Sequence, residues 1–214
     1  MLKRILIAVL LSSILFKIEA QDTFKPSTHI GIHGGINLSS VSFNPSVKQE
    51  LLTSRALGFV FRHVSEPHIG LQIEVNLAGK GWAEKIDSIG SYTRRLETID
   101  IPMTAAFIAG SKTVRFAFTI GPYVSYLRDE KEKIDIADTA DFKAYYLVPL
   151  ENKWEFGFTG GVGIEFHTKM GALGIRGLYS HSLTNLFSLD ADKVYFNGSR
   201  NQVIHVGLFY FIKL

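Results

Sequence analysis

The chain has 214 residues with no cysteine, 19 glycines, 12% aromatic residues and a formal net charge of +3. This length fits one domain, or two small ones, with a sizeable core. The lack of cysteine excludes a disulfide framework, thiolate-bound zinc, iron–sulfur clusters and a cysteine nucleophile. The hydrophobic fraction of 46% is too high for a disordered chain.

Residues 1–20 predict a secretory signal peptide. A basic start at residues 1–4 precedes an apolar run at 5–16, and the small residue Ala20 stands before Gln21. The run is too short for a membrane anchor, which needs about 20 apolar residues. Three basic residues and one acidic residue lie in this segment, so the remaining chain carries a formal charge of only +1. We therefore expect an exported, nearly neutral mature protein with no nucleic-acid partner.

The mature chain alternates apolar residues with small or polar ones, most clearly over residues 69–77. This period of two predicts β-strands with two different faces. Most of the predicted strands have about ten residues or more, as a tilted membrane-spanning strand requires. The pattern predicts eight strands, at residues 28–39, 55–65, 67–79, 92–108, 113–127, 153–167, 171–182 and 201–213.

The predicted connections are alternately short and long. Tight turns are expected at residues 65–68, 109–112 and 168–170, and long polar loops at 40–54, 80–91, 128–152 and 183–200. Outer-membrane barrels have this layout, with short periplasmic turns and long extracellular loops. We therefore predict an all-β fold: an eight-stranded antiparallel up-and-down transmembrane β-barrel over residues 28–214, after an N-terminal spacer at residues 21–27.

Alternation alone does not separate a membrane barrel from a soluble lipocalin-like one, because the apolar face points outward in the first and inward in the second. Three features favour the membrane. The polar face is rich in glycine and carries isolated charges, and the apolar face is bulky and nearly uncharged. Aromatic residues near the strand ends are expected to form interfacial girdles: Trp82, Tyr92, Tyr126, Tyr145, Tyr146, Trp154 and Phe211.

The polar face is the strongest candidate for chemistry, because its carboxylates and histidines could build an acid/base or metal site. However, side chains just fill the interior of an eight-stranded barrel, and buried charges need partners. We therefore expect a network of ion pairs that plugs the lumen, with no catalytic residue, cofactor or metal. Its predicted members are His33, Arg62, Glu74, Asp100, Arg115, Glu155, Glu165, Arg176 and His205.

Several segments follow one another in an order that is typical of one protein family. They lie at residues 31–39, 99–102, 121–123, 157–165, 176–186 and 206–214. In this order they resemble the PorT family of Bacteroidetes outer-membrane β-barrel proteins, over essentially the entire mature chain. The resemblance implies an eight-stranded barrel, in a family mostly without assigned activity. Its namesake serves a secretion system for surface proteins.

Three functions stay open. The first is a non-enzymatic structural or interaction role through the loops, with 128–152 as the expected partner surface unless it folds over its own barrel mouth. The second is an accessory barrel of a surface-protein secretion system. The third is a lipid-modifying hydrolase, suggested by Ser180, His181 and Ser182. Adjacent strand residues point to opposite faces, which disfavours pairing between His181 and either serine. Outer-membrane lipids are expected partners in all three.

Overall fold

The computed structural model describes residues 24–86, 90–136, 143–150, 152–187 and 196–214. The predicted signal peptide lies outside these ranges and stays a prediction. Among the described residues, no helix has the length and apolar character needed to cross a bilayer.

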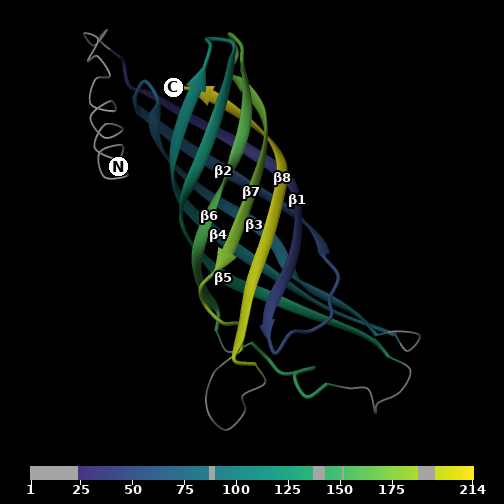
Figure 1. Ribbon diagram of the computed structural model, residues 1–214. Coiled ribbons are helices and arrows are strands. Elements are labelled where there is room, and N and C mark those ends of the chain that lie inside the picture. The colour runs from purple at the N-terminus through teal and green to yellow at the C-terminus, as the bar shows by residue number, and fades with distance from the viewer. Residues whose placement is uncertain (1–23, 87–89, 137–142, 151, 188–195) are drawn as a thin grey trace, which may run out of the picture.

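Eight antiparallel strands follow one another around a closed ring, in which β8 pairs with β1 (Figure 1). This arrangement confirms the predicted all-β up-and-down barrel. The strands are β1 (Ser27–Asn44), β2 (Leu52–Glu66), β3 (Ile69–Ile86), β4 (Gly90–Gly110), β5 (Val114–Ile136), β6 (Trp154–His167), β7 (Ala172–Ser182) and β8 (Gly198–Lys213).

The two ends of the barrel differ in the length of their connections. The turns between β2 and β3, β4 and β5, and β6 and β7 are short and lie beside the C-terminus; we name this side the turn end (Figure 1). The opposite side, which carries the longer connections, is named the loop end. The connections between β1 and β2, β5 and β6, and β7 and β8 are longer, as the sequence predicts. The predicted long loop between β3 and β4 is wrong, because only residues 87–89 separate these strands. Antiparallel neighbours can be joined by tight turns, so the strand order allows a short connection at either end.

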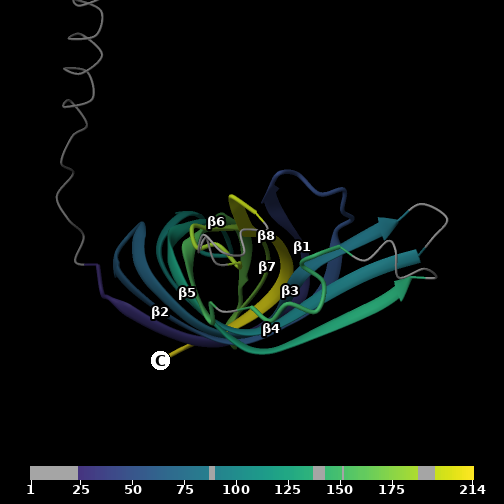
Figure 2. The same ribbon diagram turned by 90° about the horizontal axis from the view of Figure 1, so that it is seen from below.

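Strands β3, β4 and β5 are longer than the sequence pattern predicts. Inward and outward side chains continue to alternate through residues for which polar loops are predicted. Residues 80–86 of β3 and residues 128–136 of β5 lie in strands, and both segments pair with β4. The last of these pairs join Gly90 to residue 86 on one side and to residue 136 on the other. The three strands project beyond the ring as a sheet, which we name the projecting sheet (Figure 2). The prediction of loops at 80–91 and 128–152 is therefore wrong over residues 80–86 and 128–136. High charge density conceals the strand pattern there.

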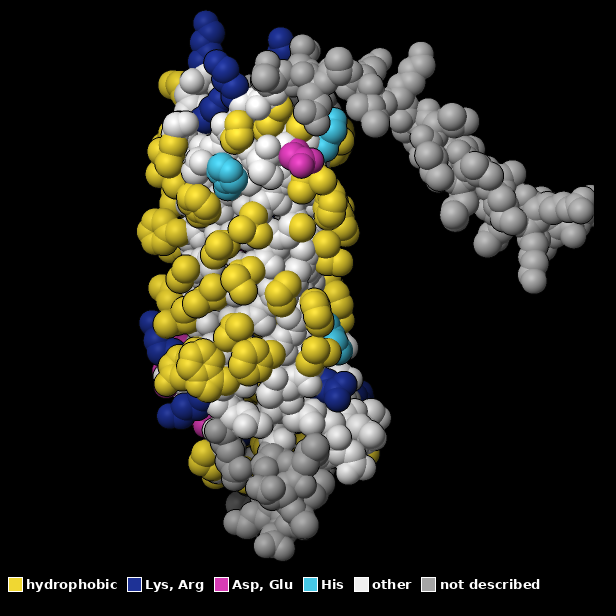
Figure 3. All heavy atoms as spheres, turned by 90° about the vertical axis from the view of Figure 1, so that its left-hand side faces the viewer, with side chains coloured by type: hydrophobic (Ala, Val, Ile, Leu, Met, Phe, Trp, Pro, Cys, Tyr) yellow, Lys and Arg dark blue, Asp and Glu magenta, His cyan; other side chains and the backbone are white. Residues whose placement is uncertain are grey.

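The outward side chains form an apolar belt around the barrel (Figure 3). Phe59 is 71% exposed, Leu57 63% and Val162 64%, values that a water-soluble surface would rarely combine. Charged side chains gather toward the two ends on the face shown in Figure 3. An apolar belt outside and a polar interior are the arrangement of a transmembrane barrel and the reverse of a lipocalin-like one.

Five of the seven aromatic residues expected in interfacial girdles face the interior instead. Trp154 is 55% exposed and lies beside Tyr126, with ring centroids 4.9 Å apart, as a girdle requires. The other five are at most 7% exposed: Trp82, Tyr92, Tyr145, Tyr146 and Phe211. Their position near strand ends is right, but position along a strand does not determine which face a residue occupies. The alternation of inward and outward side chains along the strand determines the face, and it places Trp82 and Tyr92 inward.

The belt predicts that a charge at its centre destabilises the protein. The substitution Phe59→Arg should lower the free energy of unfolding by about 2–4 kcal/mol, because an outward arginine at mid-membrane must be desolvated by lipid. Reversible urea unfolding in phospholipid vesicles measures this loss. Leu147→Arg is the control, because Leu147 is 65% exposed but lies outside the barrel strands, so it should change stability little. Equal effects at the two positions would contradict the belt.

Candidate functional site

The interior near the turn end holds a continuous set of ion pairs, which we name the turn-side network. Arg176 binds both oxygens of Glu74, at 2.5 and 2.9 Å. Arg62 pairs with Glu165 and donates to Gln72 at 2.7 Å, and Gln72 in turn donates to Glu74 at 2.6 Å. The two arginine–carboxylate pairs therefore share one hydrogen-bonded chain.

Two histidines extend this network. His33 lies 3.3 Å from Glu74 and 2.7 Å from the Asn76 side-chain oxygen, while His167 lies 3.0 Å from Glu165. The guanidinium carbon of Arg62 is also 4.4 Å from the centroid of the Phe211 ring. That contact explains why Phe211 faces inward, since an aromatic face attracts a buried cation.

A second group, the loop-side network, surrounds Glu155. This carboxylate accepts hydrogen bonds from Lys80 at 3.0 Å, Tyr123 at 2.6 Å and Asn201 at 2.6 Å. Lys80 also donates to Ser125 and lies 3.6 Å from Asp100. Lys80 is not among the predicted lumen residues, because it is the first residue of the predicted loop 80–91. Strand parity in β3 would have found it, since Lys80 continues the inward series of Glu74 and Asn76.

Two of the predicted lumen residues lie outside the ion pairs. Arg115 faces inward and pairs in register with Glu165, but it forms no salt bridge with another described residue. The His205 ring donates a hydrogen bond from Nδ1 to the Asn37 side-chain oxygen at 2.8 Å and lies edge-on to His33, with centroids 5.8 Å apart. All nine predicted residues thus lie on inward-facing positions, and seven of the nine, with Lys80, form the salt bridges of the two networks.

Glycine makes room for these side chains. A Cβ atom at Gly58 would lie 2.1 Å from the Asn76 side-chain oxygen and 2.6 Å from the His33 ring nitrogen. Any larger residue there would push apart the contact between His33 and Asn76. Between the two networks only a cavity of about 60 Å³ is left. Within the described ranges, no group of three histidine or acidic residues is placed to hold a metal ion.

The loop end carries a hydrophobic cluster of its own, which we name the cap. Most of its side chains come from the projecting sheet and from the segments that follow β5 and β7. Its members are Val41, Phe43, Trp82, Tyr92, Leu96, Tyr145, Tyr146, Leu150, Leu186, Phe187 and Phe196. Stacking of Tyr92 on Tyr146, with centroids 4.0 Å apart and planes at 14°, joins the sheet to the segment at 143–150.

Two opposite charges are buried within the cap. Glu84 is 2% exposed and accepts hydrogen bonds from Trp82 at 2.9 Å, from Tyr145 at 2.8 and 2.9 Å, and from Tyr146 at 3.1 Å. Arg94 is fully buried, pairs with Glu130 at 3.0 Å and donates to the Val148 carbonyl at 2.6 Å. A buried charge without such partners would be strongly destabilising.

Segment 143–150 therefore lies over the barrel mouth, the arrangement that the sequence analysis left open as the alternative to a partner surface. Tyr145 and Tyr146 are 6% and 5% exposed, whereas Leu147 beside them is 65% exposed. Burial and, second, the Glu84 carboxylate raise the pKa of both tyrosines above its usual value of about 10. Residues 137–142 and 151 of the same predicted loop lie outside the described ranges.

The serine and histidine residues that suggested a hydrolase do not form a pair in the described chain. Ser180 donates to Thr159 at 2.9 Å, and Ser182 donates to the Thr184 carbonyl at 3.0 Å. Both serines face inward from β7, whereas His181 lies between them on the outward face. A serine nucleophile needs its base within hydrogen-bond reach, and this geometry does not supply one.

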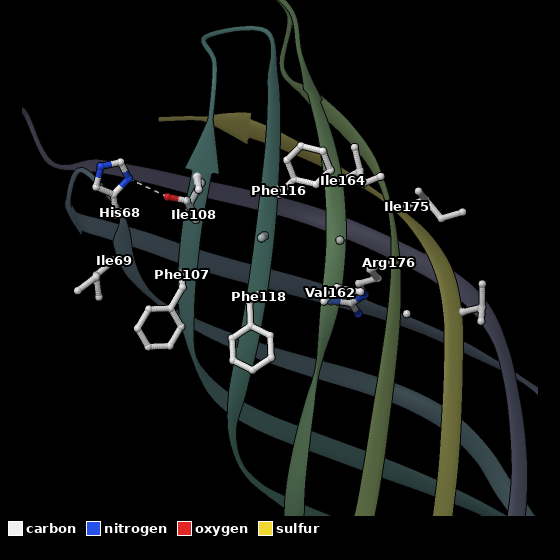
Figure 4. A pocket seen from close by; sticks show the side chains of 15 residues that line it. His68, Ile69, Phe107, Ile108, Phe116, Phe118, Val162, Ile164, Ile175 and Arg176 are labelled. Carbon is white, nitrogen blue, oxygen red and sulfur yellow. Dashed lines mark hydrogen bonds between the residues drawn. The ribbon is translucent and has the colours of Figure 1, made fainter. Parts of the chain in front are cut away.

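The outer wall also has a shallow feature. A groove of about 860 Å³ crosses β4 to β8 near the turn end, and Phe107, Phe118 and Val162 project around it (Figure 4). Its floor includes Gly177, where an added Cβ would meet no atom within 4 Å. The groove is part of the apolar belt, so lipid chains are its surroundings in a membrane.

The apolar belt, the closed ring and the paired charges inside define a transmembrane β-barrel of the outer-membrane type. The family model described as "Outer membrane protein beta-barrel domain" matches residues 19–188. The chain belongs to this outer-membrane β-barrel family, and its localisation is the outer membrane. No curated protein matches the sequence.

Several solved structures are similar to this chain at low sequence identity. The outer membrane protein OprG from Pseudomonas aeruginosa is 12% identical, over 87% of this chain and 96% of its own, with a TM-score of 0.48. Ail, the attachment invasion locus protein of Yersinia pestis, is 10% identical over 86% and 98%, with a TM-score of 0.43. Neisserial surface protein A is 10% identical over 87% and 99%, with a TM-score of 0.43.

The contacts of Lys80 in the loop-side network predict that its substitution strongly destabilises the protein. The substitution Lys80→Met removes the cation shared by Asp100 and Glu155 and should lower the free energy of unfolding by about 3–5 kcal/mol, because it leaves buried carboxylates uncompensated. Urea unfolding in vesicles measures the loss. Lys131→Met is the matched control: Lys131 also contacts two carboxylates, but its side chain is 63% exposed, so water screens these pairs and the substitution should change stability little. Similar losses for both variants would count against a structural role of Lys80.

The tyrosines of the cap predict that docking of segment 143–150 depends on pH in the alkaline range. Undocked Tyr145 and Tyr146 ionise near pH 10, whereas the docked hydroxyls have a raised pKa. Docking of segment 143–150 is therefore fully stable below about pH 10 and weakens as the pH rises further. Titration of tyrosinate absorbance should show these groups ionising later than in a Glu84→Gln variant, which removes the negative charge beside them. Coincident titrations would contradict the role of Glu84.

Proposed function

We propose that this protein is a non-enzymatic outer-membrane barrel with a closed lumen that presents its loop end to a protein partner outside the cell. The observation that carries the proposal is the projecting sheet. Residues 128–136 of β5 pair with β4 on one side, while the pairing of β5 with β6 ends at Tyr126 and Trp154. Among the described residues, the other side of this segment is a free strand edge, and such an edge can accept an added strand from a partner.

The interior supports the closed lumen. Salt bridges cross the barrel at two levels, and the cavity between them is only about 60 Å³. A cavity of that size holds a few water molecules at most and is far smaller than a ligand pocket of about 300 Å³ or more. The cap adds a third layer above Lys80. In this proposal the barrel anchors the sheet in the membrane and carries nothing through it.

The orientation follows the general rule for these barrels: short turns face the periplasm and long connections face outward. The projecting sheet then stands outside the outer leaflet. Its charges also suit an exposed position. Arg128 and Lys131 pair with Glu97 at 2.8 and 3.0 Å, and their side chains are 54% and 63% exposed. Charged side chains along an edge prevent indiscriminate pairing and so favour a selected partner.

Site-specific photo-cross-linking in intact cells tests the partner role. A photoreactive residue at Lys133 or Lys131, on the outward face of the projecting sheet, should give a discrete protein adduct. The same residue at Phe59, in the apolar belt, should give none. Adducts that are absent from both sheet positions in every growth condition, or equal at Phe59, would reject the sheet as a partner surface.

A second candidate is an accessory barrel of a surface-protein secretion system, as the resemblance to the PorT family suggests. The order of the segments that carry this resemblance along the mature chain favours it. Deletion of the protein should then leave secreted surface proteins inside the cell, with the barrel restoring their export when it is supplied again. Unchanged secretion in the deletion strain would reject this candidate and leave the first one standing.

A further inference from the structure

The cap is built as a pocket for aromatic rings that carry a hydroxyl group. Glu84 is a carboxylate at its base, held by the indole N–H of Trp82 at 2.9 Å. Aromatic walls surround this acceptor: Phe43 lies 5.2 Å from Trp82 and 4.3 Å from Phe196, measured between ring centroids. An anionic acceptor at the base of an apolar, aromatic enclosure can select a ligand by ring and hydroxyl together.

Two tyrosines of the same chain occupy this pocket. The Tyr145 hydroxyl donates to both Glu84 oxygens at 2.8 and 2.9 Å, and its ring lies 4.9 Å from Phe196. Tyr146 donates to Glu84 at 3.1 Å, and its ring stacks on Tyr92 at 4.0 Å. Each phenol thus satisfies the carboxylate and fills aromatic space at the same time.

The segment that carries these tyrosines is not part of the barrel wall. Residues 143–150 form no strand, and their described main-chain bonds to the rest of the protein are few: Leu147 donates to Glu132, and Val148 accepts from Arg94. The two phenols and Lys143, whose ammonium group also binds Glu84, therefore contribute much of the attachment. A segment held by side chains can leave without disrupting the strand pairing.

We propose that the cap is a binding site for an aromatic hydroxyl compound, either a small phenol or a tyrosine of a partner polypeptide, for which Tyr145 and Tyr146 are the internal occupants. Selectivity arises at Glu84. A ring without a hydroxyl group leaves the buried carboxylate without the donor that a phenol supplies, so binding of such a ring is weakened. This site is additional to the free edge of the projecting sheet and does not depend on it.

Fluorescence of a single tryptophan tests the proposal. The protein has two tryptophans, and Trp154→Phe leaves Trp82, at the base of the cap, as the reporter. In this background, Tyr145→Ala with Tyr146→Ala empties the pocket. p-Cresol should then alter Trp82 fluorescence and bind at least about tenfold more tightly than toluene, because a hydrogen bond to a buried charged group is worth that factor. A Leu147→Ala protein with a filled pocket corrects for partitioning into detergent.

A peptide with the sequence of residues 143–150 separates the two sources of the ligand. Binding of this peptide in preference to its tyrosine-to-phenylalanine counterpart indicates a polypeptide ligand, and binding of p-cresol alone indicates a small phenol. If toluene binds as tightly as p-cresol and the two peptides bind equally, the pocket does not recognise hydroxyl groups and the proposal is wrong.

A milder variant covers the case in which the emptied protein does not fold. Tyr145→Phe with Tyr146→Phe retains both rings and removes only their hydroxyl groups. Quenching of Trp82 by acrylamide should rise above that of the Leu147→Ala control, because the segment loses three hydrogen bonds to Glu84. Unchanged quenching would show that the hydroxyl groups do not hold the segment, which contradicts the proposal.

Discussion

Ion pairing constrains which residues the narrow barrel interior can hold. A charge that leaves water must find a partner at close range, because the cost of an unpaired buried ion exceeds the stability of most proteins. The sequence-predicted lumen set contains three arginines and four carboxylates, a deficit of one positive charge. Lys80 supplies that charge: it binds Glu155 and lies close to Asp100. The charge balance of the interior could therefore have indicated that a lysine was missing from the set.

The same constraint links the wall of the barrel to its interior. Inward positions beside the two networks must be small, and Gly58 leaves the space that His33 and Asn76 occupy. Outward residues on the same strand, such as Leu57 and Phe59, belong to the apolar belt. Toward the loop end the inward face becomes aromatic, and the tyrosines of segment 143–150 satisfy Glu84 there. The two networks and the cap are thus successive levels of one inward-facing surface.

The barrel could be predicted from the sequence because a period of two is a strong local signal, and residues 69–77 display it without interruption. The ends of β3, β4 and β5 could not, because charged residues such as those at 128–133 obscure the alternation and favour a loop interpretation. The expectation of a girdle position for Trp82 has the same origin: Trp82 falls in the predicted loop 80–91, and a loop residue has no predicted face. The contact between Glu84 and Tyr145 joins residues 61 positions apart and has no local signature at all.

Current recording across a planar lipid bilayer that contains the refolded protein tests the proposal that paired side chains close the lumen. The intact barrel should show no steady ion conductance, and Lys80→Met with Glu155→Met, which removes a crossing pair, should raise the current above this baseline. Regular conductance steps from the unaltered protein would show that the lumen is open and that the proposal is wrong.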